Sequence, residues 1–197
     1  MVSRGDLISQ VTLSGTVLTG VIAAQGNLGK IFTPSSGPAT RLGGVLVNNP
    51  FDGQLVTLGT SYGDLRFNGG LKAGRIAVKG GIAGNLVTNG IAANGAVVSG
   101  GEIGDTTWGT LFTVNGTNKG FIAAKGPVRF KAAPGGNVFT NATGSNAATI
   151  DAIFTKNGQA LSSFDASGLD LANLNLILAD LASLHVDSTG HLAGPMA

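Results

Sequence analysis

Glycine returns at a nearly constant interval through the middle of this chain, and that interval restricts the possible folds more than any other feature of the sequence. Between residues 53 and 120 the interval is 10 or 11 residues in five of six cases and 14 in the sixth. The glycines of this series are Gly53, Gly63, Gly74, Gly84, Gly95, Gly109 and Gly120. Two intervals together make a unit of about 21 residues, and repetition at such a period is typical of proteins built from stacked repeats.

The residue two positions after each glycine of this series is aliphatic. The pattern extends back to earlier glycines, which makes eleven short phrases; these glycines are Gly5, Gly15, Gly26 and Gly43. The aliphatic residues are Leu7, Val17, Leu28, Val45, Leu55, Leu65, Ile76, Leu86, Val97, Leu111 and Ile122. The residue between glycine and aliphatic position is mostly polar, and this alternation predicts β-strands with one face in a core.

We expect each pair of phrases to form one coil, because a coil must hold two strands and two corners. The predicted coils are 5–25, 26–52, 53–73, 74–94, 95–119 and 120–140. Asn-Gly, Gly-Gly and Lys-Gly pairs lie at the expected corners, where glycine supplies the positive φ of a sharp turn. The sequence therefore predicts an all-β fold, a single-stranded parallel β-helix of about six 21-residue coils over residues 1–140.

Two of the predicted coils are longer than the other four, and both gain length in the same part of the coil. Coil 26–52 gains six residues around positions 33–38, and coil 95–119 gains four around positions 102–108. Insertions on one edge of a repeat protein often mark its functional face. The alternative is that both are surface loops without a role in binding.

The glycine pattern stops after Thr140, so residues 141–197 form a separate segment. Its first part, 141–158, is expected to be an irregular last coil with a strand over 148–154. The leucine-rich stretch 169–184 has helical spacing, with Ser167 or Asp170 available as an N-cap, although a last pair of strands is the alternative.

The leucine-rich stretch has two possible roles at the end of the predicted stack. An open end exposes strand edges and apolar core, so this stretch should cap the stack or join a second copy. Its apolar residues spread around much of a helical wheel, so one face could cover the core while another meets a second chain. We therefore expect a homo-oligomer, most simply a dimer, formed through residues 169–184.

Composition excludes several classes of protein. The chain has 197 residues, of which 43% are hydrophobic and 11% charged, and it has no cysteine, so neither disulfides nor thiolate zinc sites are expected. His185 and His191 lack an identifiable third ligand, and we expect no metal and no cofactor. The first six residues do not resemble a signal peptide, and no apolar run is long enough to span a membrane. We expect no membrane insertion, although export is not excluded.

Charge is distributed unevenly along the chain. Residues 1–131 hold 11 basic and 5 acidic residues, a net charge of +6, whereas residues 132–197 hold 1 basic and 5 acidic residues, a net charge of −4. The basic residues are scattered among few aromatic residues, which argues against nucleic acid as a partner. An acidic polysaccharide is a possible partner, and a solvated surface is the simpler explanation.

Two segments resemble the parallel β-helices of bacterial extracellular proteins such as adhesin passengers. They are Gly-Arg-Ile-Ala-Val-Lys-Gly at 74–80 and Gly-Phe-Ile-Ala-Ala-Lys-Gly at 120–126, and the resemblance covers residues 5–140. It implies a glycine-rich β-solenoid at the cell surface or outside the cell, with a structural or carbohydrate-binding role. The signature residues of polysaccharide lyases cannot be placed on this chain, and the fold does not determine the function.

A carbohydrate site is the most specific chemistry that the sequence suggests. Hydrolysis of a glycoside needs two carboxyl groups, and Glu102 and Asp105 are the candidates for acid and base. Trp108 and Tyr62 could stack on a sugar ring. Further candidate substrate contacts are Asp64 and Arg66. The alternative is that the aspartates cap turns and that the tryptophan is packed.

Two hypotheses follow from these residues. The first is a non-catalytic, exported module that binds carbohydrate or acts as a scaffold. The second is a carbohydrate-active enzyme, a glycoside hydrolase or polysaccharide lyase, with its cleft framed by the two longer coils. Glycan turnover separates the two hypotheses.

Overall fold

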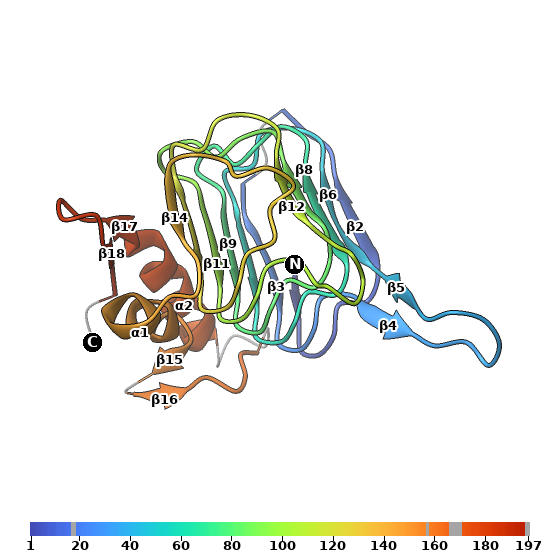
Figure 1. Cartoon of the computed structure of the whole chain (residues 1–197). Helices are drawn as coiled ribbons and strands as arrows, with labels where there is room; N and C mark the ends of the chain where they lie inside the picture. Colours follow the sequence, from blue (N-terminus) through green and yellow to red (C-terminus); the bar gives the residue numbers. More distant parts are fainter. Residues whose placement is uncertain (17–18, 157, 166–170, 196–197) are drawn as a thin grey trace.

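The computed structural model describes residues 1–16, 19–156, 158–165 and 171–195, and most of them lie in or between β-strands (Figure 1). A seven-stranded sheet has the order β1-β3-β7-β9-β11-β13-β14. Its strands are β1 (Val2–Ser3), β3 (Val21–Ala24), β7 (Gln54–Thr57), β9 (Arg75–Val78), β11 (Ala96–Ser99), β13 (Phe121–Ala124) and β14 (Asn137–Phe139). All strand pairs in this sheet are parallel.

A second sheet has five parallel strands in the order β12-β10-β8-β6-β2. Its strands are β2 (Gln10–Leu13), β6 (Gly44–Val47), β8 (Asp64–Phe67), β10 (Leu86–Thr88) and β12 (Phe112–Val114). From β6 to β13 the chain alternates between the two sheets. The prediction of a β-rich chain with parallel strands is confirmed.

The strand register repeats the period of the glycines. Leu55 pairs with Ile76, and Ile76 pairs with Val97, so each partner lies one period further along the chain. Leu65 and Leu86 in the other sheet have the same separation. These positions are fully buried between the two sheets, so the aliphatic residues of the central phrases form the core, as expected.

Isolated parallel bridges form two columns, which lie where the chain passes from one sheet to the other. One column of bridges runs from Leu28 through Ser61 and Ile82 to Ile103, and a second runs from Phe51 through Leu71 and Ile91 to Asn118. The apolar side chains of both columns are almost completely buried and complete the core. We call these the first and the second bridge column.

The predicted boundary between the second and third coils is wrong. Gly59, not Gly53, follows Gly26 in register, because the Gly59 N–H donates to the Gly26 carbonyl (2.9 Å). Ile22 pairs with Leu55, which lies much further along the chain than one period. The insertion is therefore about twice as long as predicted, since it contains an antiparallel hairpin made of β4 (Lys30–Phe32) and β5 (Thr40–Leu42).

Three of the predicted strand positions need a related correction. Leu7 and Leu28 pair in the first bridge column and lie in neither sheet. Phe112, not Leu111, pairs with Leu86 and is buried, because the second insertion shifts the register by one residue. Val17 lies outside the described residues.

The strand predicted over residues 148–154 is also wrong. Helix α1 (Gly144–Ala152) occupies most of this segment. Asn141, before the helix, and Gly144, its first residue, have positive φ values of 51° and 56°, so the chain changes direction between β14 and α1. A short hairpin follows, with β15 (Thr155–Lys156) and β16 (Gln159–Ala160).

The leucine-rich stretch forms a helix, α2 (Leu171–Ser183), in preference to strands. The hairpin that follows it consists of β17 (His185–Val186) and β18 (Leu192–Ala193). Leu169 and the proposed N-caps, Ser167 and Asp170, lie outside the described residues.

The C-terminal segment covers a face of the seven-stranded sheet, not the open end that we expected it to cap (Figure 1). One outward-facing row of that sheet consists of small apolar residues in register: Ala23, Val56, Ala77, Val98 and Ala123. Leu174, Ile177 and Leu181 of α2 belong to the same buried cluster. The small side chains allow helices to approach the sheet closely, which explains why helices can pack there.

Candidate functional site

The two insertions leave the body at the same corner. The β4–β5 hairpin lies between Leu28 of the first bridge column and β6, and it projects from the body (Figure 1). The second insertion lies between Ile103 of the same column and β12. Both insertions therefore lie on one edge of the body, as predicted.

Arg41 of β5 connects the hairpin to the body. Its Nη1 donates to Asp64 Oδ1 (2.9 Å) and to the Tyr62 carbonyl oxygen (3.0 Å). Its guanidinium carbon lies 6.0 Å from the centre of the Trp108 ring, within cation–π distance. Sequence analysis missed Arg41, although it precedes Tyr62 by one glycine period, and that spacing was the available signal.

Asp64 is held by three neighbours. Besides Arg41, the Asn85 backbone N–H donates to Asp64 Oδ1 (3.0 Å), and Arg66 Nη2 lies 3.3 Å from Oδ2. Burial raises the pKa of Asp64, but the hydrogen bonds from Asn85 and Arg41, with the charge of Arg41, outweigh burial and lower this pKa overall. Asp64 is therefore an ionised anchor, which is unsuited to the role of a proton donor.

Asp105 stabilises the turn of the second insertion. Its Oδ1 accepts from the backbone N–H groups of Thr107 (2.6 Å) and Trp108 (3.2 Å). Arg129 Nη1 donates to the Asp105 carbonyl oxygen (2.6 Å), and the Asp105 N–H donates to Thr110 Oγ1 (2.8 Å). This is the turn-capping role that the sequence left open as the alternative for this aspartate.

Glu102 lies just before the second insertion, not inside it as predicted. Ile103 is still in register with Ile82, and the Ile82 N–H donates to the Glu102 carbonyl oxygen (2.8 Å). The Glu102 carboxylate makes no hydrogen bond or ion pair with any residue that the structure describes. Its side chain lies beside Gly81, which is one glycine period earlier in the chain. We call each repeat of this period, one level of the stacked strands, a rung.

Tyr62, Glu102 and Asp105 line one open hollow of about 510 Å³. Asp64 and Arg66 instead line a second hollow of about 300 Å³, together with Arg41. Trp108 lines neither hollow and lies over Arg41 at the corner. Five of the six predicted site residues thus fall into two groups, and Arg41 contacts Tyr62 of one group and Asp64 of the other.

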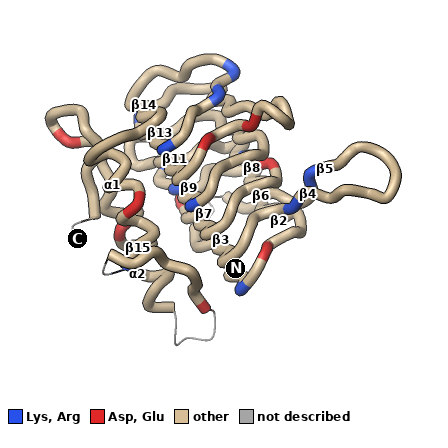
Figure 2. Tube along the Cα trace, turned by 60° about the horizontal axis from the view of Figure 1, so that its bottom comes forward, with Lys and Arg blue, Asp and Glu red and all other residues tan. Residues whose placement is uncertain are grey.

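Neither the distribution of charge nor a group of metal ligands marks a site at this corner among the described residues. Figure 2 shows basic and acidic residues spread thinly over the sheets, and acidic residues beside α1, β15 and α2. Within the described ranges, no three His, Asp or Glu side chains are grouped as metal ligands would be. Neither of the two helices described is both long and apolar enough to cross a membrane.

Comparison with known proteins gives no further assignment. No protein-family model, no curated protein and no solved structure matches this chain. Its function must therefore be inferred from its own residues.

Proposed function

We propose that residues 1–140 form a single-stranded parallel β-helix, a β-solenoid, and that residues 141–197 form an appended segment. Three observations support this architecture. Strands enter the two parallel sheets alternately, the register of the central strands repeats at the glycine period, and bridges form two columns where the chain passes from one sheet to the other. Each coil would then contain one strand of each sheet, and neighbouring coils would stack ~4.8 Å apart.

We infer that this β-solenoid is a non-catalytic, carbohydrate-binding module of the adhesin type. The observation that carries the inference is that Glu102 alone, of the two carboxylates in the 510 Å³ hollow, has no partner among the described residues. Asp105 accepts two backbone hydrogen bonds, so a free acid and base pair is not available there. A single free carboxylate and an open polar surface suit hydrogen bonding to sugar hydroxyl groups.

Tyr62 gives the hollow an aromatic surface next to Glu102. Its carbonyl oxygen accepts a hydrogen bond from Arg41, and Tyr62 lines the same hollow as Glu102. An aromatic ring beside a hydrogen-bonding group presents both an apolar face and a polar edge to a ligand. We propose that Tyr62 contacts the face of a sugar ring and that Glu102 accepts hydrogen bonds from its hydroxyl groups.

The alternative function is a glycoside hydrolase or polysaccharide lyase. One observation favours it, namely that Glu102 and Asp105 do line the same hollow. Catalysis would require Asp105 to exchange its turn contacts for contacts with substrate.

The resemblance to extracellular β-helices also supports a location outside the cell, which we propose for this chain.

A glycan panel that measures both binding and cleavage tests the proposed function. We expect wild type to bind at least one neutral glycan without releasing reducing ends. Glu102→Gln and Tyr62→Ala should each weaken that binding by about tenfold or more, because each removes a contact that the hollow provides, while Tyr62→Phe keeps the ring and should bind well.

Asp180→Asn is the matched control, since it removes a carboxylate on α2, far from the hollow in sequence. It should bind as wild type does. Cleavage that Glu102→Gln abolishes would favour the enzyme, and absence of glycan binding by wild type would contradict both functions.

We also propose a homo-oligomer formed through α2. Leu174, Ile177 and Leu181 are buried against the sheet, and Leu176 remains 41% exposed on the outer side of the helix. This leucine is the apolar side chain of α2 best placed to contact a second copy.

A further inference from the structure

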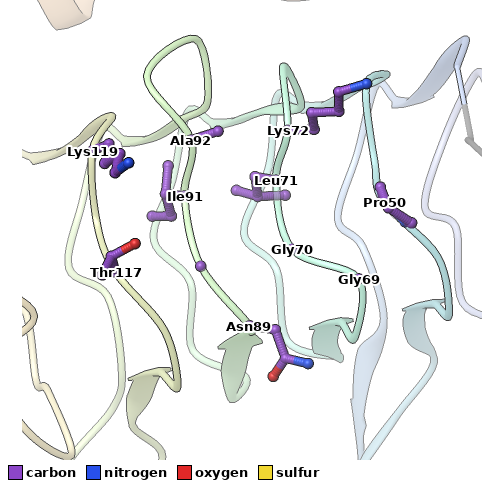
Figure 3. Close-up of a pocket in the computed structure, with 11 residues that line it drawn as sticks. Pro50, Gly69, Gly70, Leu71, Lys72, Asn89, Ile91, Ala92, Thr117 and Lys119 are labelled. Atoms are coloured by element: carbon purple, nitrogen blue, oxygen red, sulfur yellow. The ribbon is translucent and has the colours of Figure 1, made fainter.

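Two further hollows lie side by side at the opposite corner, along the second bridge column. The first, of about 340 Å³, is lined by Lys72 and Lys119 (Figure 3). The second, of about 360 Å³, is lined by Arg75, Lys119 and His185, where the C-terminal segment meets the sheet. Lys119 lines both hollows and so lies between them, and we call the two hollows together the groove.

This groove is basic. Among the residues that the structure describes, no Asp or Glu lines either of its two hollows. Lys72 forms a long, exposed ion pair with Asp52 (3.9 Å), and Arg75 donates to the carbonyl oxygens of Leu181 and Leu184. The Lys119 ammonium makes no hydrogen bond or ion pair with any described residue, so its charge is available to a ligand.

The two lysines occupy equivalent positions two rungs apart. The N–H groups of Lys72, Ala92 and Lys119 donate in turn to Phe51, Leu71 and Ile91, at 3.0, 2.9 and 2.7 Å. Two strand spacings place the lysine backbones ~10 Å apart. Figure 3 shows both lysines along one edge of the hollow and Asn89 at the opposite edge. Figure 3 shows the Lys72 side chain extending away from Lys119, so the two ammonium groups suit the repeated charges of a polymer better than one small anion.

We propose that this groove is a second binding site and that it binds an acidic polysaccharide through its carboxylate or sulfate groups. Lys119 and Lys72 contact successive anionic groups of the polymer. Gly69, Gly70 and Gly90 line the groove without side chains, so the polymer approaches the backbone closely.

The lining favours a polysaccharide over single-stranded nucleic acid. Nucleic acid would need exposed aromatic rings on which its bases stack. Phe121 is only 5% exposed, and His185 is the exposed ring of the described lining. The described lining therefore offers charge and backbone but no series of rings on which successive bases could stack.

Calorimetry on the full chain at low ionic strength tests the proposal. The probes are an oligogalacturonate, which carries carboxylates, and a dextran sulfate, with neutral dextran as the uncharged counterpart. We expect wild type to bind one or both charged probes and not dextran, and the better probe identifies carboxylate or sulfate as the preferred group. Added salt should weaken binding, because the contacts are exposed ion pairs.

Lys119→Gln should weaken binding of the preferred probe by about tenfold, and the double variant Lys72→Gln/Lys119→Gln should abolish measurable binding. Lys131→Gln is the control for charge, since Lys131 is exposed and lines neither hollow, and it should change the affinity less than about twofold. Glu102→Gln should bind the probe as wild type does, which separates this site from the hollow beside Tyr62.

Three outcomes would overturn the proposal. They are failure of wild type to bind either charged probe, an equal loss of affinity in Lys131→Gln and Lys119→Gln, and tighter binding of a thymidine oligonucleotide than of both polysaccharides.

Discussion

Arg41 donates to Asp64 and to the Tyr62 carbonyl and lies 6.0 Å from the Trp108 ring, so one side chain joins the hairpin, β8 and the second insertion. Its side chain is only 16% exposed, and its partner Asp64 is 28% exposed. A charge-assisted hydrogen bond that is shielded in this way contributes more than a surface ion pair. At the scale of single residues, the corner is therefore organised by a structural pair next to the proposed contacts.

Asp64→Asn should lower the free energy of unfolding near pH 7 by about 1 to 3 kcal/mol, because it removes charged hydrogen bonds. The pKa of Asp64 lies below its ordinary value of 3.8, so the ionised form stabilises the fold above that value. As the pH falls through the lowered pKa, this stabilisation is lost. Urea unfolding at several pH values should thus show the difference between wild type and variant shrinking in acid.

Asp180→Asn is expected to show the opposite trend, since burial raises the pKa of Asp180. Wild type should become more stable relative to this variant as the pH drops towards 3.8. A pH-independent difference for Asp64→Asn would show that its charge does not stabilise the fold.

At the scale of elements, glycines allow neighbouring rungs to stack. A Cβ added to Gly84 would lie 2.0 Å from the Gly63 carbonyl oxygen, whereas a Cβ on Gly135 would meet no described atom within 4 Å. Gly84→Ala should therefore lower the free energy of unfolding by about 1 to 3 kcal/mol. Gly135→Ala should change it by less than about 0.5 kcal/mol. Thermal unfolding of both variants checks this, and equal effects would contradict the close stacking at Gly84.

The same glycines explain which elements could be predicted from the sequence. From Gly53 to Gly95 the period is regular, because every rung needs a close backbone approach at the same place, and the strands were predicted there. Gly26 and Gly53 both precede an aliphatic residue by two positions, so their phrases looked equivalent in the sequence. In the structure the two glycines lie at different corners. The length of the first insertion, which contains the β4–β5 hairpin, was therefore underestimated.

The C-terminal segment was predicted less well for a different reason. The outward-facing alanines, such as Ala77 and Ala123, fit a strand as well as a surface that receives helices.

Arg41 was missed in the candidate site because its partners are distant in the sequence, and a lone basic residue has no local pattern.

At the scale of the whole molecule, the seven-stranded sheet depends on the C-terminal segment for cover. Deletion after Gly158 removes α2 and should expose the part of the row near β9 that α2 covers, such as Ala77, and light scattering should show aggregates. For the intact chain, the proposed contact through Leu176 predicts a multiple of 19.5 kDa, and Leu176→Lys should reduce it to 19.5 kDa. A monodisperse 19.5 kDa species for wild type would rule out the oligomer, and a monodisperse deletion variant would rule out the need for cover.

The stacking of strands places equivalent positions at a fixed spacing. Positions 72, 92 and 119 are equivalent in three neighbouring rungs, so their backbones are separated by multiples of the strand spacing, ~4.8 Å. In this chain the first and third positions are lysine and the second is alanine. For the proposed acidic polysaccharide, we expect substitutions at these three positions to change which spacing of charges is bound.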